Sequence, residues 1–142
     1  MVELNKNPLE RVIDFYKSFD DYSKYSDSEL YYHLYPSFQF KQYRTYTDDS
    51  EIIGFVNWCF LNDISARKFE TRGLILPDQW NSGGNFYIVD LVSARDTIKI
   101  TSDIKRMCLL MLGNRKEMNY LRVKNNEIKS KRTFLTKNHW SN

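Results

Sequence analysis

The stretch QWNSGGNFYIVDLVS, residues 79–93, joins a strong turn signal to the clearest strand of the sequence. Residues 81–84, NSGG, are small or polar and favour a tight change of chain direction. The segment FYIVDLVS, residues 86–93, is mostly apolar over a length typical of one strand. Asp90 is the one carboxylate in that segment. The sequence therefore predicts a central strand that carries a single ionisable group.

Two further strands are predicted before this one. Residues 38–47 carry several aromatic side chains, and the polar residues 47–50 end the segment in a turn. Residues 51–61, EIIGFVNWCFL, return from that turn as the second strand of a hairpin. Gly54 inside the second strand indicates a bulge or a close backbone approach. We expect residues 38–47, 51–61 and 86–93 to be neighbouring, mainly antiparallel strands of one sheet.

Helices are predicted at the start of the chain. Apolar residues at helical spacing indicate an amphipathic helix over residues 9–20. Ser26 and Glu29 form a capping-box pattern, which begins a second, short helix. That helix should end before Pro36, because proline disfavours helical geometry in the residue that precedes it. Residues 62–72 are polar and predict no helix or strand.

The remaining elements complete one fold. Residues 77–78, Pro-Asp, favour a short helix or a turn, and residues 102–103, Ser-Asp, offer the N-cap of a longer helix. Gly113 is placed to end that longer helix. Residues 118–123 and 127–135 read as a closing hairpin. Helices and strands in this order predict an α+β domain with a mostly antiparallel sheet packed against helices.

Composition limits the classes of protein that fit. The chain has 142 residues, 42% of them apolar and 15% aromatic, which suits one globular domain over residues 1–142. The net charge of +3 is mild and gives no reason to expect nucleic acid as a partner. No apolar run reaches the length of a membrane span. Cys59, Cys108 and the two widely separated histidines show no metal-site spacing.

Several short blocks resemble the toxin-activating lysine acyltransferases. The blocks are Asn7-Pro8-Leu9-Glu10, Tyr35-Pro36, Gln42-Tyr43, Asn57-Trp58, Gln79–Gly83 with Phe86–Asp90, and Leu121-Arg122-Val123 with Lys129 and Phe134. They follow one another in the family's order over residues 7–135, which leaves residues 136–142 as a tail. The resemblance implies a fold of the GNAT type, in which a splayed sheet opens a slot for an acyl thioester.

The resemblance also implies an activity. The family moves a fatty acyl group from acyl carrier protein to a lysine of a protein target, without the coenzyme-A phosphate loop of typical GNAT enzymes. Residues 93–97, SARDT, agree with this because they contain no glycine for cradling phosphates. We therefore expect no bound cofactor. The expected partners of an active enzyme are acyl carrier protein and a protein target.

Asp90 matches the aspartate that the family uses together with a histidine near its N-terminus. Among apolar neighbours, an inward Asp90 would act as a base or orient a histidine, whereas an outward Asp90 would be satisfied by water. Alignment places Tyr22 or Tyr25 at the histidine position, and tyrosine is a poor base at its usual pKa. The spacing between His33 and Pro36 differs from the family's histidine-to-proline spacing by about eleven residues, roughly three helical turns. This difference predicts that His33 lies far from Asp90. His139 is expected to be solvated in the tail.

Other residues and a second function complete these expectations. Trp58, Trp80 and Arg122 either bind the acyl chain or belong to the core. The enzyme hypothesis is a protein-lysine acyltransferase. The alternative is a catalytically impaired member of the family that serves as a structural or interaction subunit of a larger assembly such as a virus particle, because the aligned histidine is missing. The chain would then work in a bacterial cytoplasm or within a virus particle.

Overall fold

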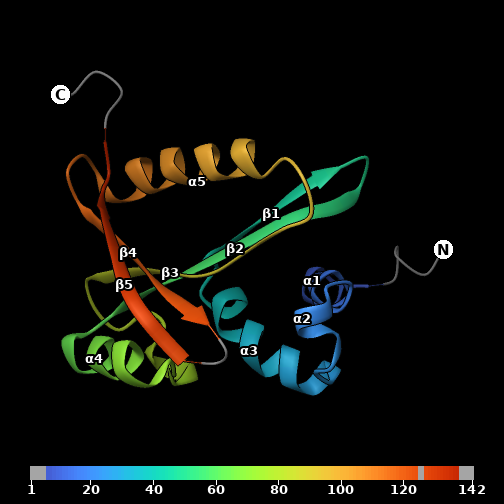
Figure 1. The fold of residues 1–142 in the computed structure, drawn as a ribbon, viewed down its shortest axis with the longest axis horizontal. Helices are drawn as coiled ribbons and strands as arrows, with labels where there is room; N and C mark the ends of the chain where they lie inside the picture. The colour runs from blue at the N-terminus through green and yellow to red at the C-terminus, as the bar shows by residue number, and fades with distance from the viewer. Residues whose placement is uncertain (1–5, 125–126, 138–142) are drawn as a thin grey trace.

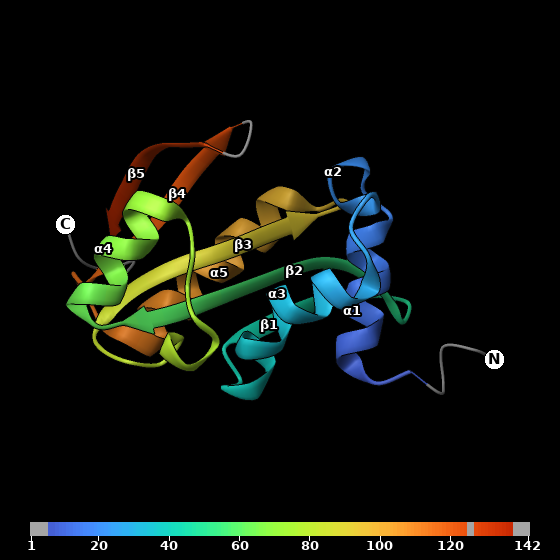
Figure 2. The same ribbon diagram turned by 90° about the horizontal axis from the view of Figure 1, so that it is seen from below.

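The computed structural model describes residues 6–124 and 127–137, which form a five-stranded open sheet with helices on both faces (Figures 1 and 2). The strands follow one another across the sheet in chain order: β1 Tyr43–Asp48, β2 Glu51–Leu61, β3 Asn85–Ser93, β4 Glu117–Lys124 and β5 Glu127–Leu135. Neighbouring strands are antiparallel except β3 and β4, which are parallel and joined through a helix. The predicted α+β class and the predicted neighbours are confirmed.

Two layers of helices cover the sheet. The helices are α1 Pro8–Lys17, α2 Asp20–Ser23, α3 Asp27–Gln39, α4 Asp63–Arg72, the 3-10 helix η2 Pro77–Gln79, and α5 Thr97–Leu112. Helix α5 packs on one face, and α1, α3 and α4 pack on the other (Figure 1). Strand β2 is buried on both faces, with Val56 and Trp58 against the α5 layer and Phe55 and Cys59 against the opposite layer. This burial explains the nearly continuous apolar run of β2.

A shift in register turns the end of β3 toward the layer of α1 and α3. Asn57 pairs with Asp90, but the next residue, Trp58, pairs with Ile88, so Val89 is the extra residue on β3. Before the shift Ile88 faces α5, and after it Val92 packs against the other layer. Because a shift of one residue exchanges the two faces of a strand, Asp90 also faces α1 and α3.

The sheet splays between its two parallel strands, as the resemblance implied. Tyr87 pairs with Asn119 and Ile88 with Tyr120, and beyond these pairs β3 and β4 diverge (Figure 2). Asp90 follows two residues after the last paired position. The structure thus places the one carboxylate of the central strand next to the point where the sheet opens.

Several boundaries differ from the predictions. The strand expected over residues 38–47 begins only at Tyr43, because α3 continues through Pro36 to Gln39. Proline removes one helical hydrogen bond, but the helix persists while its buried face packs on the core: Phe38 stacks on Tyr43 with ring centroids 3.9 Å apart. The helix expected over residues 9–20 is divided into α1 and α2.

Two helical segments, α4 and the start of α5, differ from the predictions. Residues 63–72 form α4, which buries Ala66 and Phe69 and is capped by the Asn62 side chain. Two buried residues give too weak a periodicity to indicate a helix. Helix α5 begins at Thr97 rather than near residue 102, and it ends at Gly113 as predicted. Gly54 marks a close approach, because a β-carbon there would lie 2.7 Å from Ile100 Cδ1.

Among the described residues, no helix is both long and apolar enough to cross a membrane.

The turn before β3 yields a test of the fold. A β-carbon at Gly83 would lie 2.5 Å from the Asn62 Cα atom, which belongs to the backbone, whereas a β-carbon at Gly84 would meet nothing within 4 Å. We expect Gly83→Ala to lower the free energy of unfolding by about 1–3 kcal/mol, the usual range for overpacking. The matched control Gly84→Ala should change it by less than about 1 kcal/mol. Urea unfolding measures both, and equal effects would contradict the described turn.

Candidate active site

Asp90 is the centre of a small hydrogen-bonded cluster between β3, α1 and α3. Its side chain is 14% exposed. The Oδ2 atom accepts a hydrogen bond of 2.7 Å from the Tyr16 hydroxyl and contacts His33 Nε2 at 2.6 Å. The inward orientation of Asp90, one of the two alternatives considered from the sequence, is the one found. Three elements far apart in the chain therefore meet at one carboxylate oxygen.

The prediction that His33 lies far from Asp90 is wrong. It depended on the spacing between His33 and Pro36, with a helix that ended there. Instead, the capping box of Ser26 fixes the start of α3, and Leu30 and Leu34 pack against the core. His33 lies between these two buried residues along the helix, and its ring reaches the Asp90 carboxylate. An imidazole is thus present although the aligned family position is not histidine.

Tyr16 holds the same carboxylate from α1. Its side chain is fully buried, and its ring packs against Phe55 of β2 and Tyr22 with centroid distances of 5.7 and 4.8 Å. Burial, followed by the charge of Asp90, raises the pKa of Tyr16 well above its ordinary value. The hydroxyl therefore stays protonated and donates to Asp90. The sequence analysis counted Tyr16 only as part of an amphipathic helix and missed this contact.

The electrostatics of the cluster favour an ion pair. Burial alone would raise the pKa of Asp90, but the charge and hydrogen bond of His33 and the hydrogen bond of Tyr16 outweigh burial, so its pKa lies below its ordinary value. The charge of Asp90 raises the pKa of His33 despite partial desolvation of the ring. An ionised Asp90 can only accept, so His33 Nε2 carries a proton and Nδ1 is the atom that can take up another. Uptake of that proton creates the ion pair, so the neutral His33 ring is more basic than an ordinary histidine.

A buried amide connects the two halves of the pair. Asn57 is fully buried on β2, and its Oδ1 accepts the backbone N–H of Asp90 at 2.9 Å. Its Nδ2 donates to the Ser37 hydroxyl at 3.2 Å, and Ser37 in turn donates to the Leu34 carbonyl of α3. Asn57 thus ties the strand of Asp90 to the helix of His33. A polar residue within the apolar stretch EIIGFVNWCFL was the signal that could have indicated this role.

Tyr22 and Tyr25, the two candidates for the missing histidine position, both lie at the site. Burial and the charge of Asp90 raise the pKa of Tyr22 to about 12. The Tyr22 hydroxyl therefore stays protonated near neutral pH and can donate a proton but not act as a base. Tyr25 packs beside Tyr22 with ring centroids 6.5 Å apart. The catalytic roles of both tyrosines stay predictions.

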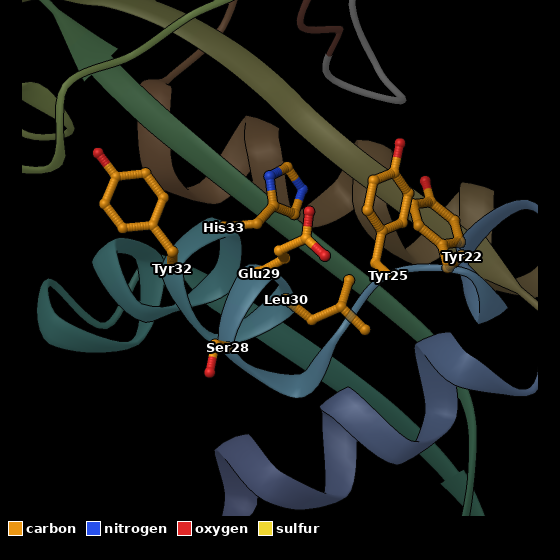
Figure 3. A pocket seen from close by; sticks show the side chains of 7 residues that line it. All are labelled: Tyr22, Tyr25, Ser28, Glu29, Leu30, Tyr32 and His33. Atoms are coloured by element: carbon orange, nitrogen blue, oxygen red, sulfur yellow. The ribbon is translucent and has the colours of Figure 1, made fainter.

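A pocket of about 550 Å³ opens beside His33 (Figure 3). Its walls include Tyr22, Tyr25, Glu29, Leu30, Tyr32 and His33. The close view shows the His33 ring and the Glu29 carboxylate between Tyr32 on one side and Tyr25 and Tyr22 on the other. Its volume is within the range of small-molecule sites, and its walls are mainly aromatic and apolar with a few polar groups.

The other predicted site residues lie elsewhere. Trp58 is buried in the layer under α5, and Trp80 is buried in the layer under α4. Neither lines the pocket beside His33. Arg122 is on β4 opposite Ser130 of β5, and His139 lies outside the described residues. A substrate-binding role for Trp58, Trp80 and Arg122 stays a prediction.

Within residues 6–124 and 127–137, no three His, Cys, Asp or Glu side chains gather in a way that could hold a metal ion. Cys59 and Cys108 are both buried. Burial raises the pKa of Cys108 to about 11 and that of Cys59 still further, so neither thiol is activated as a nucleophile. The pair of His33 and Asp90, in contrast, can carry out acid–base chemistry.

A splayed α+β sheet with a histidine–aspartate pair at its opening is the arrangement that the resemblance to acyltransferases implies. The chain belongs to the RTX toxin acyltransferase family, whose sequence profile matches residues 6–134. It is also similar to an uncharacterized protein of Synechocystis sp., with 29% identity over 111 residues that cover 73% of this chain and 76% of that protein. The family suggested by the short blocks is thus confirmed.

The pair can be tested by titration. Replacing Asp90 with Asn removes the negative charge that raises the His33 pKa, so we expect that pKa to fall in Asp90→Asn. The chemical shift of the His33 ring followed against pH measures it.

Asp103→Asn is a matched control. Asp103 accepts a hydrogen bond of 2.6 Å from the Tyr46 hydroxyl, as Asp90 does from Tyr16, but in the α5 layer. The control should leave the His33 pKa unchanged. An unchanged His33 pKa in Asp90→Asn would show that the two side chains do not interact.

Proposed function

We propose that this protein transfers an acyl group from a thioester to the amine of a protein lysine, with His33 as the general base. The observation that carries the proposal is the contact of 2.6 Å between His33 Nε2 and Asp90 Oδ2 beside an aromatic pocket. Membership of the RTX toxin acyltransferase family supports the reaction type. A lysine amine is protonated near neutral pH, so transfer needs a group that accepts its proton.

Each group of the cluster has a part in this reaction. His33 Nδ1 takes one proton from the lysine ammonium, and the neutral nitrogen attacks the thioester carbonyl carbon to form a tetrahedral intermediate. The carbon–sulfur bond then breaks, and the thiol leaves with the proton returned by the imidazolium. The nitrogen releases its second proton to water, and a neutral amide remains. Asp90 stabilises that imidazolium and holds its ring in one tautomer. Tyr16 and Asn57 keep Asp90 in place.

Acyl carrier protein is the donor that the family implies. The segment from Ser93 to Thr97, between β3 and α5, contains no glycine where a phosphate-cradling loop would lie. The segment thus lacks the usual signature of a coenzyme-A site, and the carrier-protein donor is taken from the family. The target is a protein that presents a lysine side chain.

The absence of histidine from the aligned family position was the main reason for the alternative of a non-catalytic subunit in a virus particle or another assembly. His33 supplies an imidazole from α3 in contact with Asp90. We therefore favour the enzyme.

The proposal predicts a particular pattern of loss. His33→Gln and Asp90→Asn should each slow single-turnover acyl transfer to a lysine peptide by at least about a hundredfold. Because the two residues act as one unit, the double variant should be about as slow as either single variant. Asp103→Asn should transfer at the rate of the unaltered protein. Circular dichroism verifies that every variant is folded.

Transfer at the unaltered rate in folded His33→Gln would exclude His33 as the base. Losses that multiply in the double variant would show that the residues act separately.

A further inference from the structure

The pocket beside His33 combines a carboxylate with aromatic walls. Glu29 precedes His33 by four residues on α3, so both side chains lie on the same face of the helix. In Figure 3 the Glu29 carboxylate and the His33 ring are both seen between Tyr25 and Tyr32, and all four residues line the pocket. Tyrosine faces attract cations, and a carboxylate binds them directly. This combination suits an organic cation on a slender apolar stem.

The capping box holds Glu29 in place and charged. Its Oε1 atom accepts the backbone N–H of Ser26 at 2.9 Å, while the Ser26 hydroxyl accepts the backbone N–H of Glu29 at 3.1 Å. These hydrogen bonds lower the pKa of the Glu29 carboxyl. Capping uses one carboxylate oxygen, so the side chain keeps its negative charge and a second oxygen that can accept a hydrogen bond.

An ammonium group already binds one of these rings. Lys24 Nζ lies 5.6 Å from the ring centroid of Tyr25, within the range of a cation–π contact. A primary ammonium can thus lie against the Tyr25 ring.

We propose that the pocket beside His33 receives the alkylammonium end of the acceptor lysine, with Glu29 binding the ammonium and Tyr25 and Tyr32 lying beside its stem. The inference rests on the proposed function, since it assigns the acceptor side of that reaction. Glu29 holds the lysine while it is charged and releases it once His33 has taken one proton. Glu29 is accordingly a specificity residue for an amine, and the fatty chain of the donor lies elsewhere.

Binding without a donor tests this assignment directly. The probes are N-acetyl-lysine methylamide and N-acetyl-norleucine methylamide, which share a four-carbon stem and differ in the ammonium group. Shifts of the tyrosine and His33 ring signals of the full chain report binding. We expect the lysine probe to bind the unaltered protein about threefold to tenfold more tightly than the norleucine probe. Glu29→Gln should remove this preference, because glutamine can retain the capping bond while losing the charge.

Ser26→Ala is the matched control. It breaks the other half of the capping box and leaves the Glu29 carboxylate, so the preference for lysine should persist. Equal binding of both probes to the unaltered protein, no binding of the lysine probe, or an unchanged preference in Glu29→Gln would each overturn the inference. Tighter binding of the norleucine probe would assign the pocket to an apolar chain instead.

The acyltransferase proposal and the amine pocket are contradicted by different results. Glu29-dependent binding of the lysine probe by a protein that transfers no acyl group would support the amine pocket and contradict the acyltransferase proposal. In a protein that does transfer, Glu29→Gln should raise KM for a lysine peptide about threefold to tenfold and leave kcat nearly unchanged.

Discussion

The largely buried carboxylate of Asp90 is the constraint on which the rest of the site depends. A charged group taken out of water destabilises the fold unless it is paired and hydrogen-bonded. Here Tyr16 of α1 and His33 of α3 both bind its Oδ2 atom, at 2.7 and 2.6 Å. The N-terminal helices therefore pack on the sheet and also supply the groups that keep Asp90 ionised. In return, the carboxylate makes the imidazole of His33 more basic.

The sheet has to deliver Asp90 to those helices, and one extra residue does so. Without the register shift at Val89, Asp90 would share a face with Ile88 and point into the apolar layer under α5. Asn57 is the residue of β2 that pairs with Asp90, and its side chain accepts the backbone N–H of Asp90. Because the shift lies just beyond the last pairing of β3 with β4, the opening of the sheet and the orientation of the acid–base pair arise in one place.

Apolar pattern and turn chemistry predicted β2, β3, their pairing and the closing hairpin, since these features are local. The orientation of Asp90 could not be predicted, because it depends on a register shift that neither strand reveals alone. The position of His33 was predicted wrongly because its spacing to Pro36 differs from the family's by about eleven residues. Spacing along the chain does not show that α3 packs with His33 against Asp90. The resemblance places the family's histidine position at Tyr22 or Tyr25, whereas in this chain the imidazole comes from His33 on α3. A site is defined by where atoms meet, and the order of residues in the chain is secondary.

The central claim is that the imidazole next to Asp90 takes the proton of the acceptor amine, and the pH dependence of single-turnover acyl transfer tests it most directly. The base works only when neutral, so the rate should rise with pH and level off with a midpoint equal to the His33 pKa measured by titration of its ring. Because Asp90 raises that pKa, the midpoint should lie above the ordinary histidine value of about 6.5. In Asp90→Asn the midpoint should move to lower pH. A profile without this midpoint, or the same midpoint in His33→Gln, would contradict the account.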